Sequence, residues 1–420
     1  MAFLEQYDAA AVEDRWLLTR DWLDDRPLAL FAELREKRPV LDTPECVLFA
    51  RYVDVIEIMR QPKTFTVELY VPAIGEFMLA QDDTPLHTRE KAVMHSMLNR
   101  DDIAARVRKM VADQARQLLD AANGHLDLGQ EYSRLVPISI VQDYFGLDGE
   151  DKKKMIGWSY SKQLDAFRNQ TFLQLDDRDT VRKNSDQAGQ EIAAFLGQLL
   201  GRKGAALKEG KAGDDIVTRL LQTQFPPAVD FPIQRAARNA GGLLVGTIET
   251  TSQAVLQCLR QLFKRPDVLA RAVAAAQSED TTEIDGIVWE ALRWDPVAPF
   301  VFRLTAHDQV VAGGTARETL VPKGKVVLAL LQSAMFDPEL FPHPEQFDST
   351  RPFESYMHFG WGTHECLGKH VGMVLIPEMV RQLLLRPGVK PDAELDFGGT
   401  PYPQHYMMSW NGNGAGSTYA

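Results

Sequence analysis

The stretch FGWGTHECLGKH, residues 359–370, places one cysteine, Cys366, among several glycines. Glycines allow close backbone approach and unusual dihedral angles, and the apolar segment that follows predicts a helix whose N-terminus would stabilise a thiolate. The stretch therefore fits a metal-ligand loop. A lone cysteine beside a glycine turn is more often a buried structural residue, however, and one thiol alone cannot build a zinc site.

The same stretch resembles the haem-ligand signature of the cytochrome P-450 superfamily, Phe-Gly-x-Gly-x-His-x-Cys-x-Gly, and fills every fixed position. The resemblance implies haem b as the cofactor, with Cys366 as the proximal thiolate and metal ligand. It further implies that His364 hydrogen-bonds a haem propionate, that Phe359 packs near the thiolate, and that Gly360 and Gly368 are cofactor-binding positions. A thiolate ligand pushes electron density onto iron and favours O–O bond cleavage.

A second informative segment is ARNAGGLLVGTIETTSQAVLQCLRQLF at residues 237–263, an apolar helix interrupted by glycines and a polar cluster. Burying Glu249 there is costly unless the carboxylate has partners or a task. Thr250 follows Gly246 by four residues, so its hydroxyl can bond that carbonyl and open the helix locally. The residues alone leave two interpretations, this opened site or a helix turned so that Glu249 meets water.

The resemblance favours the first interpretation, because Gly246-Thr-Ile-Glu249-Thr250 is similar to the oxygen-binding segment of the superfamily. It implies Glu249 and Thr250 as catalytic residues that deliver protons to dioxygen. Thr247 stands where the family commonly has glycine, which bears on the local kink or on substrate contact. Family geometry implies substrate-binding positions at Gly242, Val245, Gly246, Thr247, Pro299, Val301 and Met407. The pocket residues are largely apolar, so we expect a compact hydrophobic substrate.

Glu290 and Arg293 lie at positions i and i+3 of a predicted helix over residues 282–294, which Asp295-Pro296 ends. Taken alone, this spacing is typical of a surface ion pair. Together with the later FDSTRPF, it resembles the buried Glu-Arg-Arg triad of the superfamily. The resemblance implies a structural role for Glu290, Arg293 and Arg351.

Three further basic positions match the family pattern. His87 and Lys91, in DDTPLHTREKAVMHSML, align with the helix whose His and Arg bind a haem propionate, and Arg303 occupies the position of another propionate-binding arginine. Lys91 replaces the family's arginine, so a bidentate contact becomes a point charge. The alternative for Lys91 and Arg303 is an ordinary solvated surface charge.

The resemblance runs from roughly Leu28 to the C-terminus and implies a mainly α cytochrome P-450 fold with a small β-rich lobe. We expect a single domain over residues 1–420. Its helix-rich body lies at about 80–295 and 353–390, and its strand-rich parts lie at about 38–60 and 297–332.

Local patterns add three expectations. GRKGAALKEGKAGDD at 201–215 is rich in Gly and Lys and predicts a solvated loop between two helices. Pro377 should kink or end the first half of the helix after the ligand loop. The polar, glycine-rich residues 411–420 predict a flexible tail.

Composition bounds the compartment and the partners. Lys plus Arg 46 against Asp plus Glu 58 gives a net charge of −12, which argues against a nucleic-acid partner held by global charge. Three scattered cysteines are a poor disulfide framework and favour a reducing, cytoplasmic compartment. The sequence contains no uninterrupted run of about 18 apolar residues, so we expect no membrane anchor.

The chain shows no fused flavin or iron–sulfur region, so it resembles bacterial members that take electrons from a separate ferredoxin and ferredoxin reductase. We expect a monomer. Basic residues cluster around elements that the family turns toward its redox partner, namely Arg89, Lys91, Arg100, Arg106, Arg108, Lys109 and Lys369. An acidic ferredoxin could dock there by electrostatic steering. Alternatively, these are ordinary solvated charges.

The leading hypothesis is a haem-thiolate monooxygenase that uses dioxygen and two externally supplied electrons to oxidise a hydrophobic small molecule. One alternative is a peroxide-driven or redox-neutral haem-thiolate enzyme, such as a peroxygenase, isomerase or dehydratase. Another is a haem sensor without turnover. The intact pair of Glu249 and Thr250 favours the monooxygenase, because neither alternative needs a proton relay to dioxygen.

Overall fold

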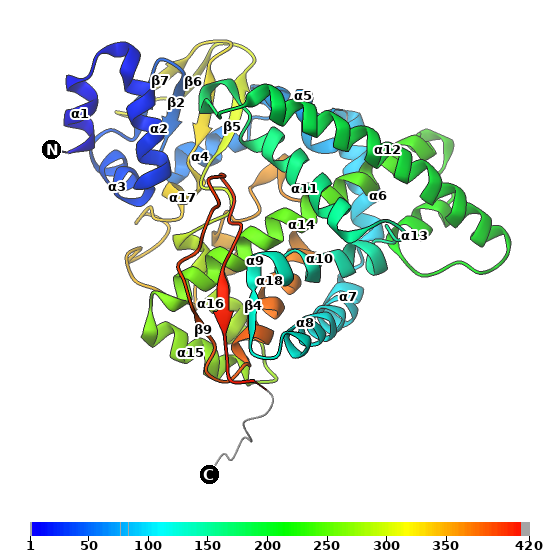
Figure 1. Ribbon diagram of the computed structural model, residues 1–420. Coiled ribbons are helices and arrows are strands. Elements are labelled where there is room, and N and C mark those ends of the chain that lie inside the picture. Colours follow the sequence, from blue (N-terminus) through cyan, green and yellow to red (C-terminus); the bar gives the residue numbers. More distant parts are fainter. Residues whose placement is uncertain (1, 76, 83, 413–420) are drawn as a thin grey trace. The chain divides into compact units, whose positions relative to one another are not determined.

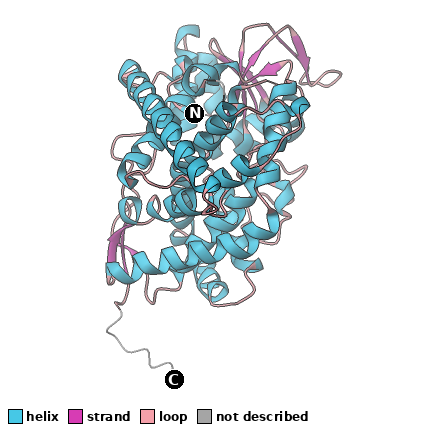
Figure 2. Cartoon of the chain, turned by 90° about the vertical axis from the view of Figure 1, so that its right-hand side faces the viewer, coloured by secondary structure: helices cyan, strands magenta, loops and turns pink. Residues whose placement is uncertain are grey.

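The computed structural model describes residues 2–75, 77–82 and 84–412 and is mostly helical (Figures 1 and 2). The chain divides into two compact units. The first unit comprises Met1–His87, Asn169–Asp176 and Ala298–Cys366, and the second comprises Thr88–Arg168, Asp177–Val297 and Leu367–Ala420. The arrangement as one domain stays a prediction. Of the predicted tail, residues 413–420 lie outside the described part of the chain.

The first unit is built on a five-stranded sheet with the order β1-β2-β8-β5-β3. Strand β2 pairs parallel with β8, and the other neighbours pair antiparallel. All four residues of β2, CVLF, are buried, as expected for an apolar run in the interior of a sheet. The strands are β1 (Val40–Asp42), β2 (Cys46–Phe49), β3 (Phe65–Thr66), β5 (Val301–Thr305) and β8 (Val326–Ala329).

Short helices and one hairpin complete the first unit (Figure 1). The hairpin joins β6 (Gln309–Val311) to β7 (Thr319–Val321). The helices are α1 (Phe3–Ala9), α2 (Arg15–Asp25), α3 (Pro27–Lys37), α4 (Tyr52–Met59), α5 (Val71–Ile74) and α17 (Leu331–Ala334). Helix α6 (Pro85–Met97) begins in the first unit and continues in the second.

The second unit packs around α14 (Ile233–Phe263), which contacts α11, α12, α16 and α18. Its apolar side chains are buried over most of the C-terminal half. Among the described residues, no helix is both long and apolar enough to cross a bilayer. The remaining helices are α7 (Arg100–Asp102), α8 (Arg108–Ala122), α9 (Leu128–Glu131), α10 (Leu135–Ser139), α11 (Lys152–Phe167), α12 (Arg178–Lys208), α13 (Ile216–Gln222), α15 (Pro266–Ala276), α16 (Thr282–Trp294) and α18 (Lys369–Leu384).

A small antiparallel sheet closes the second unit, with the order β4-β10-β9. Its strands are β4 (His125–Asp127), β9 (Lys390–Pro391) and β10 (Met407–Ser409). Strand β10 brings the C-terminal part of the chain beside the start of α9.

The structure corrects two local predictions. Helix α12 continues to Lys208, so the expected loop at 201–215 begins only near Gly210, whose φ is 68°. Alanine, leucine and lysine are strong helix formers and outweigh the two glycines of this stretch. Helix α18 does not end at Pro377, which is buried inside it. The proline costs about 3 kcal/mol, and the buried apolar side chains that follow it in the helix offset that cost.

Candidate functional site

Cys366 lies at the end of a loop of the first unit, and backbone hydrogen bonding within the loop stabilises its conformation. The Cys366 amide donates to the Phe359 carbonyl at 2.8 Å. Gly360 and Gly362 adopt φ angles of 71° and 72°, which favour glycine. A Cβ atom on Gly362 would lie 3.1 Å from the carbonyl oxygen of Met59. The backbone therefore requires two glycines of the predicted motif, while the Cys366 side chain remains exposed.

The C-terminal end of α4 supports this loop. The Arg60 guanidinium lies 5.1 Å from the centre of the Trp361 ring, a cation–π contact. Met59 places its carbonyl beside Gly362 and its sulfur 3.8 Å from Nη2 of Arg303. Sequence reasoning missed Met59 and Arg60, because the end of an ordinary helix carries no motif.

Arg303 is a buried cation on β5. Its side chain donates to the Phe302 carbonyl at 2.8 Å and hydrogen-bonds the Tyr70 hydroxyl. Burial lowers the pKa of Arg303, because desolvation disfavours the charged form, while Tyr70 and the more distant Asp82 act in the opposite direction. Among the described residues, no carboxylate lies within ion-pair distance of this guanidinium. Among the described residues nothing supplies an anion to Arg303, so its guanidinium is suited to an anionic ligand.

The two predicted cofactor-binding histidines lie together. The ring centres of His87 and His364 are 5.0 Å apart, and both residues belong to the first unit. His87 is buried near the start of α6, and His364 belongs to the cysteine loop. The other two predicted positions, Lys91 and Gly368, belong to the second unit.

The donors of the first unit fit a haem group. An exposed thiol can ligate iron, and a buried guanidinium suits a propionate carboxylate. Cys366 would hold the iron, while Arg303, His87 and His364 would hold the propionates. The first unit thus offers both kinds of donor that a haem needs.

In the second unit, Glu249 is fully buried on α14. Its carboxylate accepts two hydrogen bonds from Arg134, from Nε at 2.9 Å and from Nη2 at 3.0 Å. Arg134 also donates to the carbonyls of Gly129 and Pro403, at 2.9 and 3.0 Å. The interpretation in which Glu249 meets water is therefore wrong. Sequence reasoning missed Arg134, although a charged residue beside the apolar run LVPIS at 135–139 was a visible signal.

Thr250 uses its hydroxyl as the four-residue spacing predicts, donating to the carbonyl of Gly246. Gly246 is exposed, and a Cβ atom there would meet nothing within 4 Å. The hydroxyl is thus held to the backbone, and its oxygen lone pairs can still accept a hydrogen bond from another donor.

Glu290 and Arg293 form a buried ion pair on α16. Nε of Arg293 donates to Oε2 of Glu290 at 2.9 Å, and neither side chain is exposed. The surface-pair interpretation is therefore wrong. Arg351 belongs to the first unit, where it donates to the carbonyls of Pro342 and His343 at 3.0 and 3.1 Å. Its shared structural role with the other two residues stays a prediction.

The predicted substrate-binding positions are divided between the units. Pro299 and Val301 are half-buried at the start of β5 in the first unit. Met407 is half-buried on β10 in the second unit, and the remaining positions on α14 are Gly242, Val245, Gly246 and Thr247. Their common role stays a prediction.

Several bases of the predicted docking cluster are already paired with acids of the second unit. Arg108 donates to Asp285 at 2.9 Å and to buried Glu378 at 3.1 Å, which ties α8 to α16 and α18. Arg89, Arg106 and Lys109 pair with Asp230, Asp214 and Asp113, respectively. The pairing favours ordinary balanced charges at these four positions, and the docking role of the whole cluster stays a prediction.

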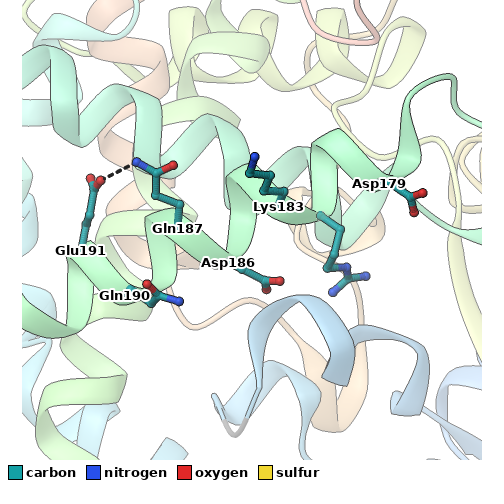
Figure 3. A pocket seen from close by; sticks show the side chains of 7 residues that line it. Asp179, Lys183, Asp186, Gln187, Gln190 and Glu191 are labelled. Carbon is teal, nitrogen blue, oxygen red and sulfur yellow. Dashed lines mark hydrogen bonds between the residues drawn. The ribbon is translucent and has the colours of Figure 1, made fainter.

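A polar hollow lies along α12 and is lined only by side chains of that helix (Figure 3). Within it, Gln187 donates to Glu191 at 2.9 Å. The lining residues are Asp179, Arg182, Lys183, Asp186, Gln187, Gln190 and Glu191. None of them is a predicted site residue, so we assign no part of the chemistry to this hollow.

Comparisons with known proteins identify the family and the fold of this chain. The family model for cytochrome P450 matches residues 56–396. The chain is 27% identical over 402 residues to the cytochrome P450 monooxygenase PikC of Streptomyces venezuelae. That alignment covers 92% of this chain and 88% of PikC. The chain is 27% identical over 366 residues to the vitamin D(3) 25-hydroxylase of Pseudonocardia autotrophica, covering 83% and 82%. The structure of cytochrome P450 CYP109Q5 from Chondromyces apiculatus shares the fold, with a TM-score of 0.76, 21% identity and coverage of 93% and 97%.

The chain belongs to the cytochrome P450 family, a family of haem-thiolate monooxygenases. The predicted mainly helical P450 fold with small sheets is confirmed. The cofactor is haem, bound through a cysteine thiolate, and the protein is an oxidoreductase.

Proposed function

We propose that this protein hydroxylates or otherwise oxidises a compact hydrophobic small molecule in the cytoplasm, as a monomer that receives two electrons from a separate ferredoxin and ferredoxin reductase. In the balanced reaction, the substrate C–H bond and one oxygen atom become C–OH. The other oxygen atom takes two protons and two electrons and leaves as water. When bound, the haem supplies the activation of dioxygen.

The observation that carries this proposal is the α14 segment. A fully buried carboxylate, Glu249, directly precedes a hydroxyl, Thr250, that is anchored to the backbone. Burying a carboxylate costs free energy, and its bidentate partner Arg134 offsets that cost. An acid-alcohol pair kept at this cost suits a reaction that consumes protons.

The chain's own residues then have distinct tasks. Cys366 would ligate the iron, and Arg303 with His364 and His87 would hold the propionates. Both carboxylate oxygens of Glu249 are engaged by Arg134, so one of them must leave the guanidinium before it takes a proton. A proton from that oxygen would reach the Thr250 hydroxyl oxygen, and the hydroxyl would release its own proton, until then hydrogen-bonded to the Gly246 carbonyl, toward the reacting dioxygen.

We infer the substrate class from the predicted substrate-binding positions and from the names of two similar proteins. The predicted contact positions are largely apolar, from Val245 on α14 to Val301 on β5 and Met407 on β10. Two relatives are named for hydrophobic substrates, the vitamin D(3) 25-hydroxylase and, at 24% identity, the steroid C26-monooxygenase of Mycobacterium tuberculosis. A compact hydrophobic ring compound is therefore the first class to screen.

The first experiment tests the haem ligand. The purified protein is reduced with dithionite and exposed to carbon monoxide, and a strongly red-shifted Soret band is expected. Cys366→Ala should abolish that band, whereas Cys258→Ala, which removes a buried thiol on α14, should keep it. A band of the histidine-ligated type in the native protein would exclude Cys366 as the ligand.

The second experiment tests the proton relay. Turnover is measured with a surrogate ferredoxin and reductase and, separately, with hydrogen peroxide alone. Thr250→Ala should divert electrons from product to peroxide. Thr19→Ala is the matched control, because Thr19 on α2 makes the same hydroxyl bond to the carbonyl four residues before it. Product with peroxide alone would favour a peroxygenase, and no turnover with any hydrophobic substrate would favour a sensor.

A further inference from the structure

A side chain of α11 bridges two backbone groups of α14. Ser159 is fully buried, and its hydroxyl donates to the Val245 carbonyl at 2.8 Å. The same oxygen accepts the Glu249 backbone N–H at 3.2 Å. Val245 and Glu249 are four residues apart, so these are the two groups that an ideal α-helix pairs with each other. Ser159 therefore occupies a step of the hydrogen-bond ladder of α14.

A second side chain of α11 strengthens the bridge. Gln163, one turn after Ser159, donates from Nε2 to the Val245 carbonyl at 3.0 Å. The backbone carbonyl of Gln163 accepts the hydroxyl of buried Tyr402 at 3.0 Å. A carbonyl oxygen has two lone pairs, and two side-chain donors use both. The Val245 carbonyl is thus less available to the Glu249 N–H, and the Ser159 oxygen serves as an acceptor for that N–H from outside the helix.

The bridge lies beside the acid-alcohol pair. The Val245 carbonyl accepts a hydrogen bond from the Ser159 hydroxyl, and the next carbonyl, that of Gly246, accepts one from the Thr250 hydroxyl. Two successive carbonyls bound by side-chain donors loosen one turn of a helix, as an inserted polar group does. Glu249 is thus held twice, at its backbone by Ser159 and at its carboxylate by Arg134.

We propose that Ser159 is a positioning residue for proton delivery, because it fixes the backbone turn from Val245 to Thr250 in the loosened form. This inference rests on the proposed function and names a residue that acts through Glu249 and Thr250. Without the hydroxyl, the Glu249 N–H loses this acceptor and the turn can close onto its own Val245 carbonyl, which shifts the Thr250 hydroxyl.

Amide hydrogen exchange tests the bridge without turnover. In Ser159→Ala, exchange at the Glu249 amide should become roughly fivefold faster, the size expected for one net hydrogen bond. The control is Ser139→Ala, because buried Ser139 on α10 donates only within its own helix, to the Val136 carbonyl at 2.7 Å. Ser139→Ala should leave the exchange at Glu249 unchanged, and Ser159→Thr, which keeps a hydroxyl, should stay close to the native protein. Equal exchange in the two alanine variants would overturn the proposal.

The haem-loaded enzyme gives the second readout. Ser159→Ala should raise the solvent isotope effect on kcat and the share of electrons lost to peroxide, with KM unchanged, whereas Ser139→Ala should change none of these. A change in KM alone would contradict a positioning role. If Ser159→Ala does not fold, Ser159→Cys replaces it in both assays with the same expectations. A native protein lacking a thiolate-haem spectrum would refute the proposed function, yet the exchange assay would still decide whether Ser159 bridges α14.

Discussion

Replacing Arg134 by methionine should destabilise the second unit strongly. In the native protein, Glu249 is fully buried, and Arg134 is the partner that its carboxylate has among the described residues. The Arg134→Met variant keeps a similar side-chain volume but leaves a buried carboxylate with no cation. Breaking a buried pair in this way costs about 3–5 kcal/mol. The melting temperature should therefore fall by roughly 5–10 °C.

Removing the charge of the other partner, Glu249, should lower the free energy of unfolding by less. Glu249→Gln keeps the shape of the side chain, and Arg134 retains the carbonyls of Gly129 and Pro403 as acceptors. The remaining loss is that of charge-assisted hydrogen bonds, about 1.5–3 kcal/mol. In the double variant of Arg134→Met and Glu249→Leu no buried charge is stranded, so its cost should be smaller than the sum of the costs of Arg134→Met and Glu249→Leu measured singly.

The assay is urea unfolding followed by far-ultraviolet circular dichroism, with Arg116→Met as the control. Arg116 lies on α8, is more than half exposed and pairs with Asp113. Its loss should change the free energy of unfolding by less than about 0.5 kcal/mol. The reasoning fails if Arg134→Met costs no more than Arg116→Met, or if the double variant costs the full sum.

Three further outcomes are expected. Without haem, iodoacetamide should label the exposed Cys366 of the folded protein and leave Cys258 unlabelled, because burial raises the pKa of the Cys258 thiol. Bound haem should protect Cys366 from the reagent, and peptide mass spectrometry measures both outcomes. Arg303→Leu should speed haem transfer to apomyoglobin at least tenfold, since a hydrogen bond to a charged group is worth about 1.5–3 kcal/mol. Hydrogen bonds from Arg219 lower the pKa of Asp214, so the stability that Asp214 contributes is present above about pH 4 and lost as the pH falls through its lower folded value. Asp214→Asn should thus cost under about 1 kcal/mol at pH 7 and progressively less as the pH falls below about 4, by urea unfolding at each pH.

Spacing along the sequence correctly predicted hydrogen bonds between residues three or four positions apart on one helix. The three-residue step from Glu290 to Arg293 and the four-residue step from Gly246 to Thr250 each place two groups on one helix face, and both bonds are present. Propensity alone was less reliable, since it predicted a loop where α12 continues and allowed α18 to end at Pro377, where the helix continues. In α18, burial of the helix outweighs the preference of a single residue.

The sequence by itself determined the family and its cofactor, because a fixed spacing of Cys, His and Gly in one short loop encodes the ligand chemistry. Only the tertiary structure decided which residues support the predicted pair of Glu249 and Thr250. Arg134 is 115 residues from Glu249, and Ser159 is 90 residues from it. No periodicity links such positions, because the packing of α10 and α11 against α14 brings them together. A single buried arginine or serine carries no pattern until the fold supplies its partner.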